Sequence, residues 1–329
     1  MYIFNIFDLI LLSIISFFTT FISFYLLKKR KHFDLNTLKL SQSKNIVTSL
    51  GISFSINFVI IFLYTIIFNQ DIWNILPNRN YIFFGSIIIL SLVSFWDDIK
   101  EIDPKFRLII QLIVVYFSLT NLDLQNLNVP LKLIIFLALI IWVYIINITN
   151  FIDGSDGHCA IHSISFFIGI IYISSFFQLE NFSFYLAIVN LIILFWFSIF
   201  NKPSAKAYMG DVGSIYLGYI IGFIILENIL LSKSLYVLSI FLYPIIDCTI
   251  TLAKKTYNGI YPWVKMGDYF FLKPIINGQN HKKVFFVSII YNIVNLFFLF
   301  LQINFSDLFF ILNVLNAFIL LIYFNSFKK

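Results

Sequence analysis

Apolar runs of about 17 to 23 residues recur along the whole chain, and they constrain the fold more than any other feature. A helix of roughly 20 apolar residues is long enough to cross a hydrocarbon core of about 30 Å. The runs therefore predict an all-α, polytopic integral membrane protein with eleven membrane-spanning helices. We place the spans at residues 6–27, 46–68, 81–96, 106–121, 131–149, 160–177, 183–200, 213–231, 235–253, 284–302 and 307–325. The spans at 81–96 and 106–121 are short, and tilt or partial insertion there would leave ten helices.

Composition supports the same class. Hydrophobic residues fill 60% of the 329 positions and charged residues only 12%, so the chain cannot cover itself with polar surface as a soluble protein does. Lipid must therefore be its solvent. Since no soluble domain fits between the spans, we expect residues 1–329 to form a single membrane-embedded domain.

Basic residues set the expected orientation. Of the 22 Lys and Arg residues, 19 fall on one side of the predicted topology, and Arg79, Lys132 and Lys233 fall on the other. Because Lys and Arg in short loops are retained in the cytoplasm, we expect the amino terminus outside and the carboxyl terminus inside. The net charge of +6 then reflects membrane topology, and we expect no nucleic-acid partner.

Four polar stretches lie on this inner side, at residues 97–107, 147–159, 201–213 and 254–283. The first begins with the adjacent carboxylates Asp97 and Asp98. Such a pair at a membrane edge is costly unless a cation, a metal-bound phosphate or water satisfies it. The alternative is a solvated helix end followed by a charged turn.

The second stretch spaces two amides and two carboxylates three residues apart, at Asn147, Asn150, Asp153 and Asp156. Residues three apart share one face of a helical turn, so these four side chains can converge on one ligand. The glycines that follow each carboxylate allow close approach of the backbone.

The third stretch contains Gly210-Asp211-Val212-Gly213-Ser214 at the start of an apolar run. A helix start of this kind offers backbone N–H groups to a phosphate and a carboxylate to a hard cation. The alternative is an ordinary N-cap, with Asp211 or Ser214 satisfying the first turn. The fourth stretch ends in His281 and two lysines, which could bind a pyrophosphate.

In this order the motifs resemble a known family. They read Asp-Asp, then N-x-x-N-x-x-D-G-x-D-G, then N-x-x-x-A-K-x-x-M-G-D-x-G-S-x-x-L-G, across about residues 34 to 283. This pattern resembles the polyprenyl-phosphate N-acetylhexosamine-1-phosphate transferases of glycosyltransferase family 4. The family includes the initiating transferases of O-antigen, enterobacterial common antigen and teichoic acid, and more distantly phospho-N-acetylmuramoyl-pentapeptide transferase. The stretches Pro244-Ile245-Ile246-Asp247 and Lys105-x-Arg107-x-x-x-Gln111 also resemble the family.

The resemblance implies transfer of an N-acetylhexosamine 1-phosphate from a UDP-sugar to undecaprenyl phosphate, with release of UMP. It implies Mg2+ as cofactor, with Mn2+ as the alternative, and a bacterial inner membrane location with the active site facing the cytoplasm. Homodimer formation stays open.

Residue roles follow from the resemblance and from the chemistry of each side chain. Asp211 is expected to bind Mg2+ with Asn150 nearby, Asp97 to orient or deprotonate the lipid phosphate, and Asp98 to hold the metal or diphosphate indirectly. The expected nucleotide ligands are Asn147, Asp153 and Asp156, and the expected phosphate ligands are Lys105, Arg107, Lys206 and His281.

Two departures leave the donor sugar open. The family's Pro-Thr-Pro-Arg-Gly-Gly segment is replaced by residues 45–51, which keep only the last glycine, Gly51. His281 stands where the family usually has two or three histidines, and the missing His-His-His cluster argues against a muramoyl-pentapeptide substrate. Two other functions stay open: a transporter or lipid flippase, which charges at the membrane edge disfavour, and an inactive family member.

Overall fold

The computed structural model describes residues 4–30, 46–68, 80–122, 124, 130–179, 181–232, 236–261 and 269–327. Arg79, Lys233 and residues 262–268 of the 254–283 stretch lie outside the described residues. Over the described residues the chain is α-helical, without any strand longer than one isolated bridge. The α-helices are α1 Ile6–Lys29, α2 Ile52–Phe68, α3 Asn80–Ile99, α4 Pro104–Ser118, α5 Leu131–Phe151, α6 His158–Phe176, α7 Phe182–Asn201, α8 Gly210–Ser232, α9 Tyr236–Ile240, α10 Leu242–Tyr257, α11 Lys273–Ile276, α12 His281–Asn304 and α13 Phe309–Asn325, with 3-10 turns η2 Leu119–Asn121 and η3 Phe270–Leu272.

The helices confirm the predicted class of polytopic all-α membrane protein. Among the described residues, seven helices are long and apolar enough to cross a membrane, namely α1, α3, α5, α6, α7, α8 and α12. α2 and α13 are apolar but only 17 residues long. α4 and α10 have 15 and 16 residues and carry charges, so the number eleven stays a prediction.

The span predicted at 235–253 differs from the structure. It is two helices, α9 and α10, which meet at Phe241. Pro244 lies in the first turn of α10, where its missing N–H and its ring prevent the preceding helix from continuing. Counting apolar residues does not detect this break, because Pro244 interrupts hydrogen bonding and not hydropathy.

The second predicted span, 46–68, begins as a helix only at Ile52. Before it, Val47 forms an isolated bridge with Ala207, and the chain turns at Leu50 and Gly51. These residues lie beside residues 206–209. The N–H of Tyr208 donates to Val47 O at 2.8 Å, and the N–H of Gly51 donates to Met209 O at 2.9 Å. This pairing removes the first six residues of the predicted span from the helix.

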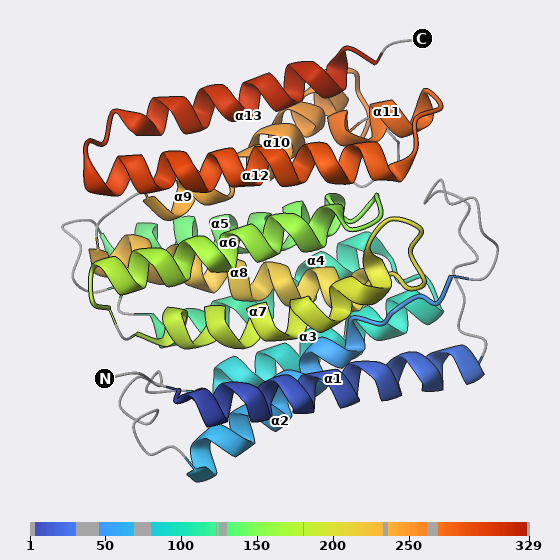
Figure 1. Ribbon diagram of the computed structural model, residues 1–329, viewed down its shortest axis with the longest axis vertical. Coiled ribbons are helices and arrows are strands. Elements are labelled where there is room, and N and C mark those ends of the chain that lie inside the picture. Colours follow the sequence, from blue (N-terminus) through green and yellow to red (C-terminus); the bar gives the residue numbers. More distant parts are fainter. Residues whose placement is uncertain are drawn as a thin grey trace.

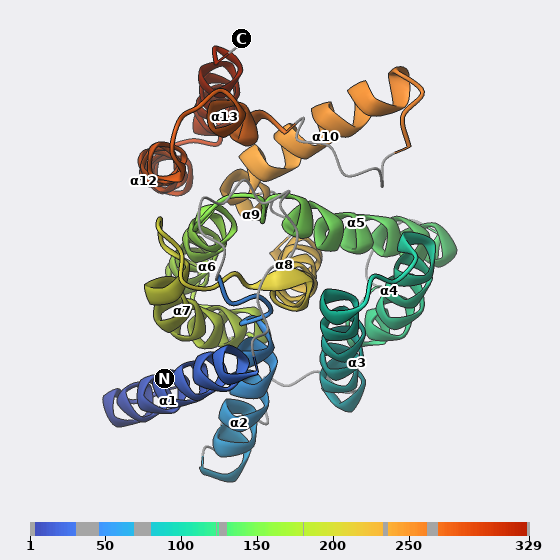
Figure 2. The same cartoon turned by 90° about the vertical axis from the view of Figure 1, so that its right-hand side faces the viewer.

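Helix α8 is the centre of the bundle. Figure 2 shows it enclosed by α3, α5, α6 and α7, and nearly all of its length is buried. On α5, Trp142 is fully buried, stacks on Tyr219 with ring centroids 5.0 Å apart and donates its indole N–H to Tyr219 O at 2.8 Å. α8 therefore begins in the polar stretch at 201–213 and runs through the middle of the core.

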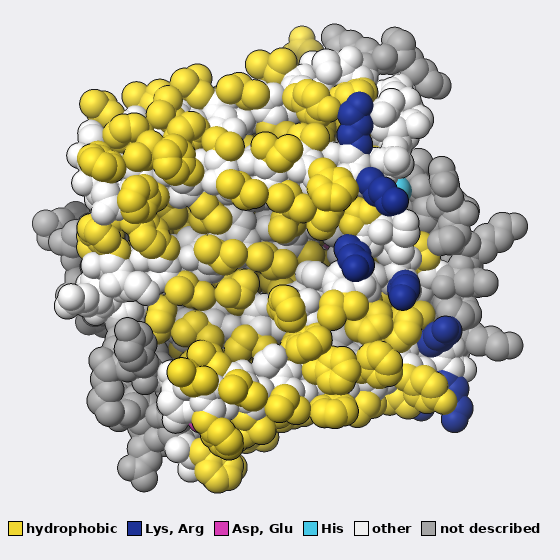
Figure 3. All heavy atoms as spheres, in the orientation of Figure 1, with side chains coloured by type: hydrophobic (Ala, Val, Ile, Leu, Met, Phe, Trp, Pro, Cys, Tyr) yellow, Lys and Arg dark blue, Asp and Glu magenta, His cyan; other side chains and the backbone are white. Residues whose placement is uncertain are grey.

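The polar stretches gather at one end of the bundle. At this end α3, α5, α7 and α10 finish, and α4, α6, α8 and α12 begin (Figure 1). Figure 3 shows a broad hydrophobic surface with Lys and Arg side chains along this same end. α1 begins and α13 ends at opposite ends of the bundle, which agrees with an odd number of crossings.

Candidate active site

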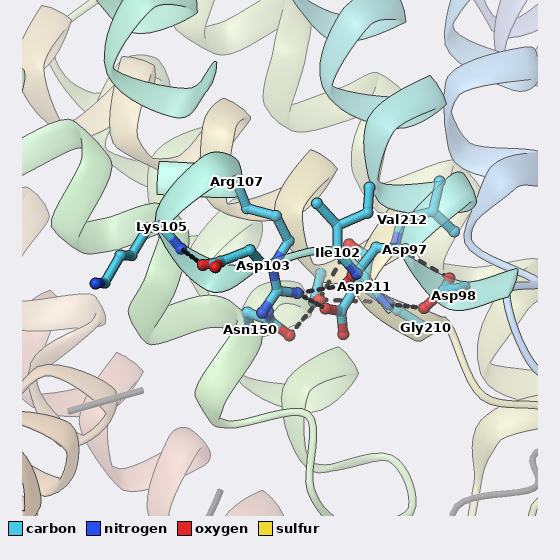
Figure 4. Close-up of polar contacts among 11 residues, drawn as sticks. Asp97, Asp98, Ile102, Asp103, Lys105, Arg107, Asn150, Gly210, Asp211 and Val212 are labelled. Carbon is cyan, nitrogen blue, oxygen red and sulfur yellow. Dashed lines mark hydrogen bonds and ion pairs between the residues drawn. The ribbon is translucent and has the colours of Figure 1, made fainter. Parts of the chain in front are cut away.

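The guanidinium of Arg107 joins two of the predicted catalytic carboxylates. Its Nη1 donates to Asp211 Oδ2 at 2.5 Å and also to Asp97 Oδ2. These side chains come from three helices, α4, α8 and α3, and point toward one another in Figure 4. The side chain of Asp97 is only 9% exposed and that of Asp211 is 29% exposed, so Asp211 is the more open to a ligand.

The local sequence explains how Arg107 reaches this position. Asp97 Oδ1 accepts the N–H of Ile102 at 2.6 Å, which stabilises the turn after α3. Asp103 then caps α4 by accepting the N–H of Lys105 at 2.8 Å, with Pro104 at the first helical position. α4 therefore starts a few residues after the aspartate pair, and Arg107 on its first turn faces back toward Asp97.

Asp98 faces the opposite way from Asp97 and caps helix α8. Its carboxylate accepts the N–H of Asp211 at 2.9 Å and that of Val212 at 3.4 Å. Gly210 allows this contact, because its φ is +70° and a Cβ there would lie 2.4 Å from Asp98 Oδ2. A carboxylate at a helix N-terminus is favoured both by hydrogen bonding and by the helix dipole.

This cap answers the question that the sequence left open at 210–214. Asp211 and Ser214 are not N-caps, since α8 is capped by Asp98 from α3. The Ser214 hydroxyl instead lies 3.1 Å from Asn150 Oδ1 on α5 and also near Gly210 O. Asn150, predicted beside Asp211, is thus held at the start of α8 (Figure 4).

A second polar cluster joins the other stretches. Asp156 Oδ2 accepts the N–H groups of Ser204 and Ala205, each at 3.1 Å. His281 Nδ1 lies 3.2 Å from the N–H of Asp156, 3.1 Å from Ser155 Oγ and 3.5 Å from Asp156 Oδ1. The buried carboxylate of Asp156 thus connects the 147–159, 201–213 and 254–283 stretches, which the sequence predicted only to share one side.

The remaining predicted residues occupy different settings. Asn147 donates to Gln111 Oε1 on α4 at 2.8 Å, and Asp153 is buried with its N–H bonded to Asn150 O. Lys105 is exposed and points away from Asp97 and Asp211 in Figure 4. Lys206 is exposed as well, and its carbonyl accepts the N–H of Val47.

Gly51 proved more important than the sequence suggested. A Cβ on Gly51 would lie 2.2 Å from the Cα of Gly213, so the backbones of two glycines touch where α2 and α8 begin. The signal was present, because Gly51 is the one glycine of the family segment that this chain keeps. Gln111 was likewise noted only as part of the resemblance, although it binds Asn147.

The donor set fits a divalent cation that shares its ligands with substrate. Among the described residues, no three His, Cys, Asp or Glu side chains form a metal cage. Asp97 and Asp211 nonetheless converge on one positive group, the Arg107 guanidinium, with the amide oxygen of Asn150 close to the start of α8. Mg2+ is commonly held by one or two carboxylates, with phosphate and water as its other ligands.

The fold and this site define a multi-pass α-helical membrane protein with a carboxylate and arginine centre at the basic end of its bundle. Residues 80–228 match the family model described as glycosyl transferase family 4, so this part of the chain, a little under half of it, is similar to that family. The matched residues run from α3 into α8 and contain every predicted site residue except His281.

Curated relatives agree with the family match. The chain is 27% identical over 188 residues to "Phospho-N-acetylmuramoyl-pentapeptide-transferase" of Streptococcus sanguinis, covering 52% of this chain and 57% of the relative. It is 28% identical over 190 residues to "Probable undecaprenyl-phosphate N-acetylglucosaminyl 1-phosphate transferase" of Bacillus subtilis, covering 53% and 52%. A phospho-N-acetylmuramoyl-pentapeptide-transferase of Streptococcus pneumoniae is 30% identical over 187 residues, covering 51% of this chain and 55% of the relative. The chain thus spans about half the length of the curated relatives it matches.

Proposed function

We propose that this protein transfers a hexosamine 1-phosphate, of the N-acetylated kind, from a UDP-sugar to a polyprenyl phosphate such as undecaprenyl phosphate. The observation that carries the proposal is the meeting of Asp97, Arg107 and Asp211, from three helices, at the basic end of a membrane bundle. Both kinds of relative bear names of phosphosugar transferases.

The proposed reaction is a phosphoryl transfer between two phosphate groups. An oxygen of the lipid phosphate bonds to the phosphorus attached to the sugar, and the bond from that phosphorus to the bridging oxygen breaks. UMP leaves with the electron pair of that bond, so no oxidant or further reactant is needed. Such transfers depend on placement and on neutralising charge more than on covalent help from the protein.

The residues of the Arg107 cluster divide this work. When Mg2+ is bound, Asp211 and Asn150 would hold it, with Asp97 beside them, and the ion would neutralise diphosphate charge. Asp97 would orient the lipid phosphate, and Arg107 would bind phosphate oxygens. Asp98 holds the first turn of α8 in place, and through it Asp211.

Asn147, Asp153 and Asp156 would hold the nucleotide, the last of them within the second cluster. Lys105, Lys206 and His281 would meet phosphate charge at the protein surface. The lipid phosphate lies at the headgroup level and a UDP-sugar is dissolved in water, so this chemistry needs a site at an interface. We place it at the cytoplasmic face of a bacterial inner membrane, because the basic end carries it.

The test is to incubate the purified protein with Mg2+, undecaprenyl phosphate and a panel of UDP-N-acetylhexosamines, and to measure UMP. We expect UMP release with at least one donor and loss of at least about 100-fold for Asp211→Ala. Ser214→Ala is the comparison variant on the same helical turn: it removes only the hydroxyl that contacts Asn150 and leaves the Asp211 carboxylate, so it should lose far less. No UMP from any donor would overturn the proposal, and unchanged turnover of Asp211→Ala would overturn the role of Asp211.

A further inference from the structure

Asp247 on α10 is a fully buried carboxylate outside the site described above. It accepts hydrogen bonds from Tyr243 Oη at 2.7 Å and Thr251 Oγ1 at 3.2 Å on its own helix. It also accepts the backbone N–H groups of Phe270 and Phe271, at 3.0 and 3.3 Å. The carboxylate therefore ties α10 to a segment more than twenty residues further along the chain.

That segment, Tyr269 to Leu272, is named here the aromatic turn. The ring of Tyr269 stacks on Phe151, with centroids 5.7 Å apart and planes at 26°. The ring of Phe271 stacks on His158, with centroids 4.3 Å apart and planes at 13°. Both partners flank the loop that contains Asp153 and Asp156, so the aromatic turn supports this loop at its two ends.

Gly154 makes the contact closer still. A Cβ at this position would lie 3.2 Å from Phe271 Cζ and 3.3 Å from Leu272 Cδ2. Between Asp153 and Asp156, the loop backbone therefore packs directly against the aromatic turn. A small displacement of the aromatic turn would move both carboxylates.

We propose that Asp247 is a positioning residue, which fixes the aromatic turn and through it the loop that carries Asp153 and Asp156. The two backbone N–H groups form charge-assisted hydrogen bonds with the buried carboxylate. Removing the carboxylate leaves both donors without this acceptor, which costs free energy. This role rests on the proposed function only in that the loop is taken to bind the nucleotide. The match to the family model ends at residue 228, before Asp247.

Hydrogen–deuterium exchange on the full-length protein in detergent tests the positional part without any assay of activity. Asp247→Ala should raise exchange in peptides covering 269–272 and 151–158. Gly154→Ala perturbs the same contact from the loop side and should raise exchange in the same two peptides. It also decides the question if Asp247→Ala does not fold. Unchanged exchange over 151–158 in both variants would overturn the proposal.

The matched control is Glu227→Gln on α8. Glu227 is also a carboxylate that accepts a backbone N–H, that of Ser183 at 2.9 Å, and it lies near the end of α8, whereas the site lies at the start of α8. It should lower the melting temperature without changing exchange over 151–158. If Glu227→Gln raises exchange there as much as Asp247→Ala does, the effect is general loosening and the proposal fails.

Kinetics separate positioning from a merely structural role. We expect Asp247→Ala to raise KM for the UDP-sugar about 10-fold, with KM for undecaprenyl phosphate changed less than about 2-fold. Asp247→Asn keeps one carbonyl oxygen as acceptor and should recover part of the loss. Equal changes in both KM values, or no recovery in Asp247→Asn, would contradict the proposal. If the wild-type protein releases no UMP, the proposed function fails, while the exchange experiment still decides the role of Asp247.

Discussion

The carboxylate of Asp98 accepts the backbone N–H of Asp211 at 2.9 Å. Asp98 therefore fixes the backbone of Asp211, whereas its neighbour Asp97 faces the side chain of Asp211 across Arg107. Asp97 reaches the side chain of Arg107, and Arg107 reaches the side chain of Asp211. Two neighbouring carboxylates thus do different work: Asp98 places the start of α8, and Asp97 belongs to the charged centre.

This division predicts different responses to two substitutions of Asp98. Asp98→Asn keeps an oxygen that can accept the N–H of Asp211, whereas Asp98→Ala removes the cap and should cost about 1 kcal/mol of stability. We expect UMP release to fall much further in Asp98→Ala than in Asp98→Asn. Steady-state rates with melting temperatures would check this. Equal loss in both variants would show that the charge of Asp98 acts on substrate directly.

Removing the guanidinium should increase the effect of Mg2+ on stability. In Arg107→Ala, Asp97 and Asp211 lose their shared positive partner, so their repulsion favours a bound cation. We expect the melting temperature of Arg107→Ala to rise with Mg2+ more than that of the wild-type protein. Asp97→Asn combined with Arg107→Ala is the control and should lose this response. A rise no larger than the wild-type rise would contradict a cation site here.

His281 should be replaced best by asparagine. Its Nδ1 accepts the N–H of Asp156, and an asparagine Oδ1 occupies nearly the same place, whereas a glutamine oxygen resembles Nε2. We expect His281→Asn to keep KM for the UDP-sugar within a few-fold of wild type, and His281→Gln and His281→Ala to raise it about 10-fold. The opposite ranking would indicate that Nε2 meets the substrate.

The contact between Gly51 and Gly213 predicts a steric defect. Gly51→Ala places a methyl group 2.2 Å from a backbone atom, which should cost about 1 to 3 kcal/mol or more. Gly85→Ala on α3 is the matched control, since nothing lies within 4 Å of a Cβ there. Thermal unfolding should show a lower melting temperature for Gly51→Ala alone. Equal melting temperatures would mean that the two backbones separate easily.

Much of the fold follows from the sequence because hydropathy reports lipid exposure directly. Long apolar runs have few alternatives to helices in a bilayer, so their approximate positions are predictable. The break at Phe241 was missed because one proline changes hydrogen bonding without changing hydropathy. The late start of α2 was missed because residues 46–51 pair with a segment about 160 residues away, which no local pattern reveals.

The site was predictable as a set of residues but not as a set of contacts. The regular spacing of Asn147, Asn150, Asp153 and Asp156 suggested one shared ligand, whereas in the structure Asn147 binds Gln111 and Asp156 binds the 201–213 stretch. Asp98 as a helix cap depends on where α3 ends relative to α8. That relation is set by packing, and a sequence motif does not contain it.

The bridge made by Arg107 has a consequence for the order of events. One guanidinium faces two carboxylates, so the centre carries more negative than positive charge, and both proposed substrates are anions. A phosphate that arrives alone is repelled, whereas one that arrives with its divalent ion brings the missing positive charge. Metal and nucleotide should therefore enter together, and the measured affinity for the nucleotide should depend on the concentration of its Mg2+ complex.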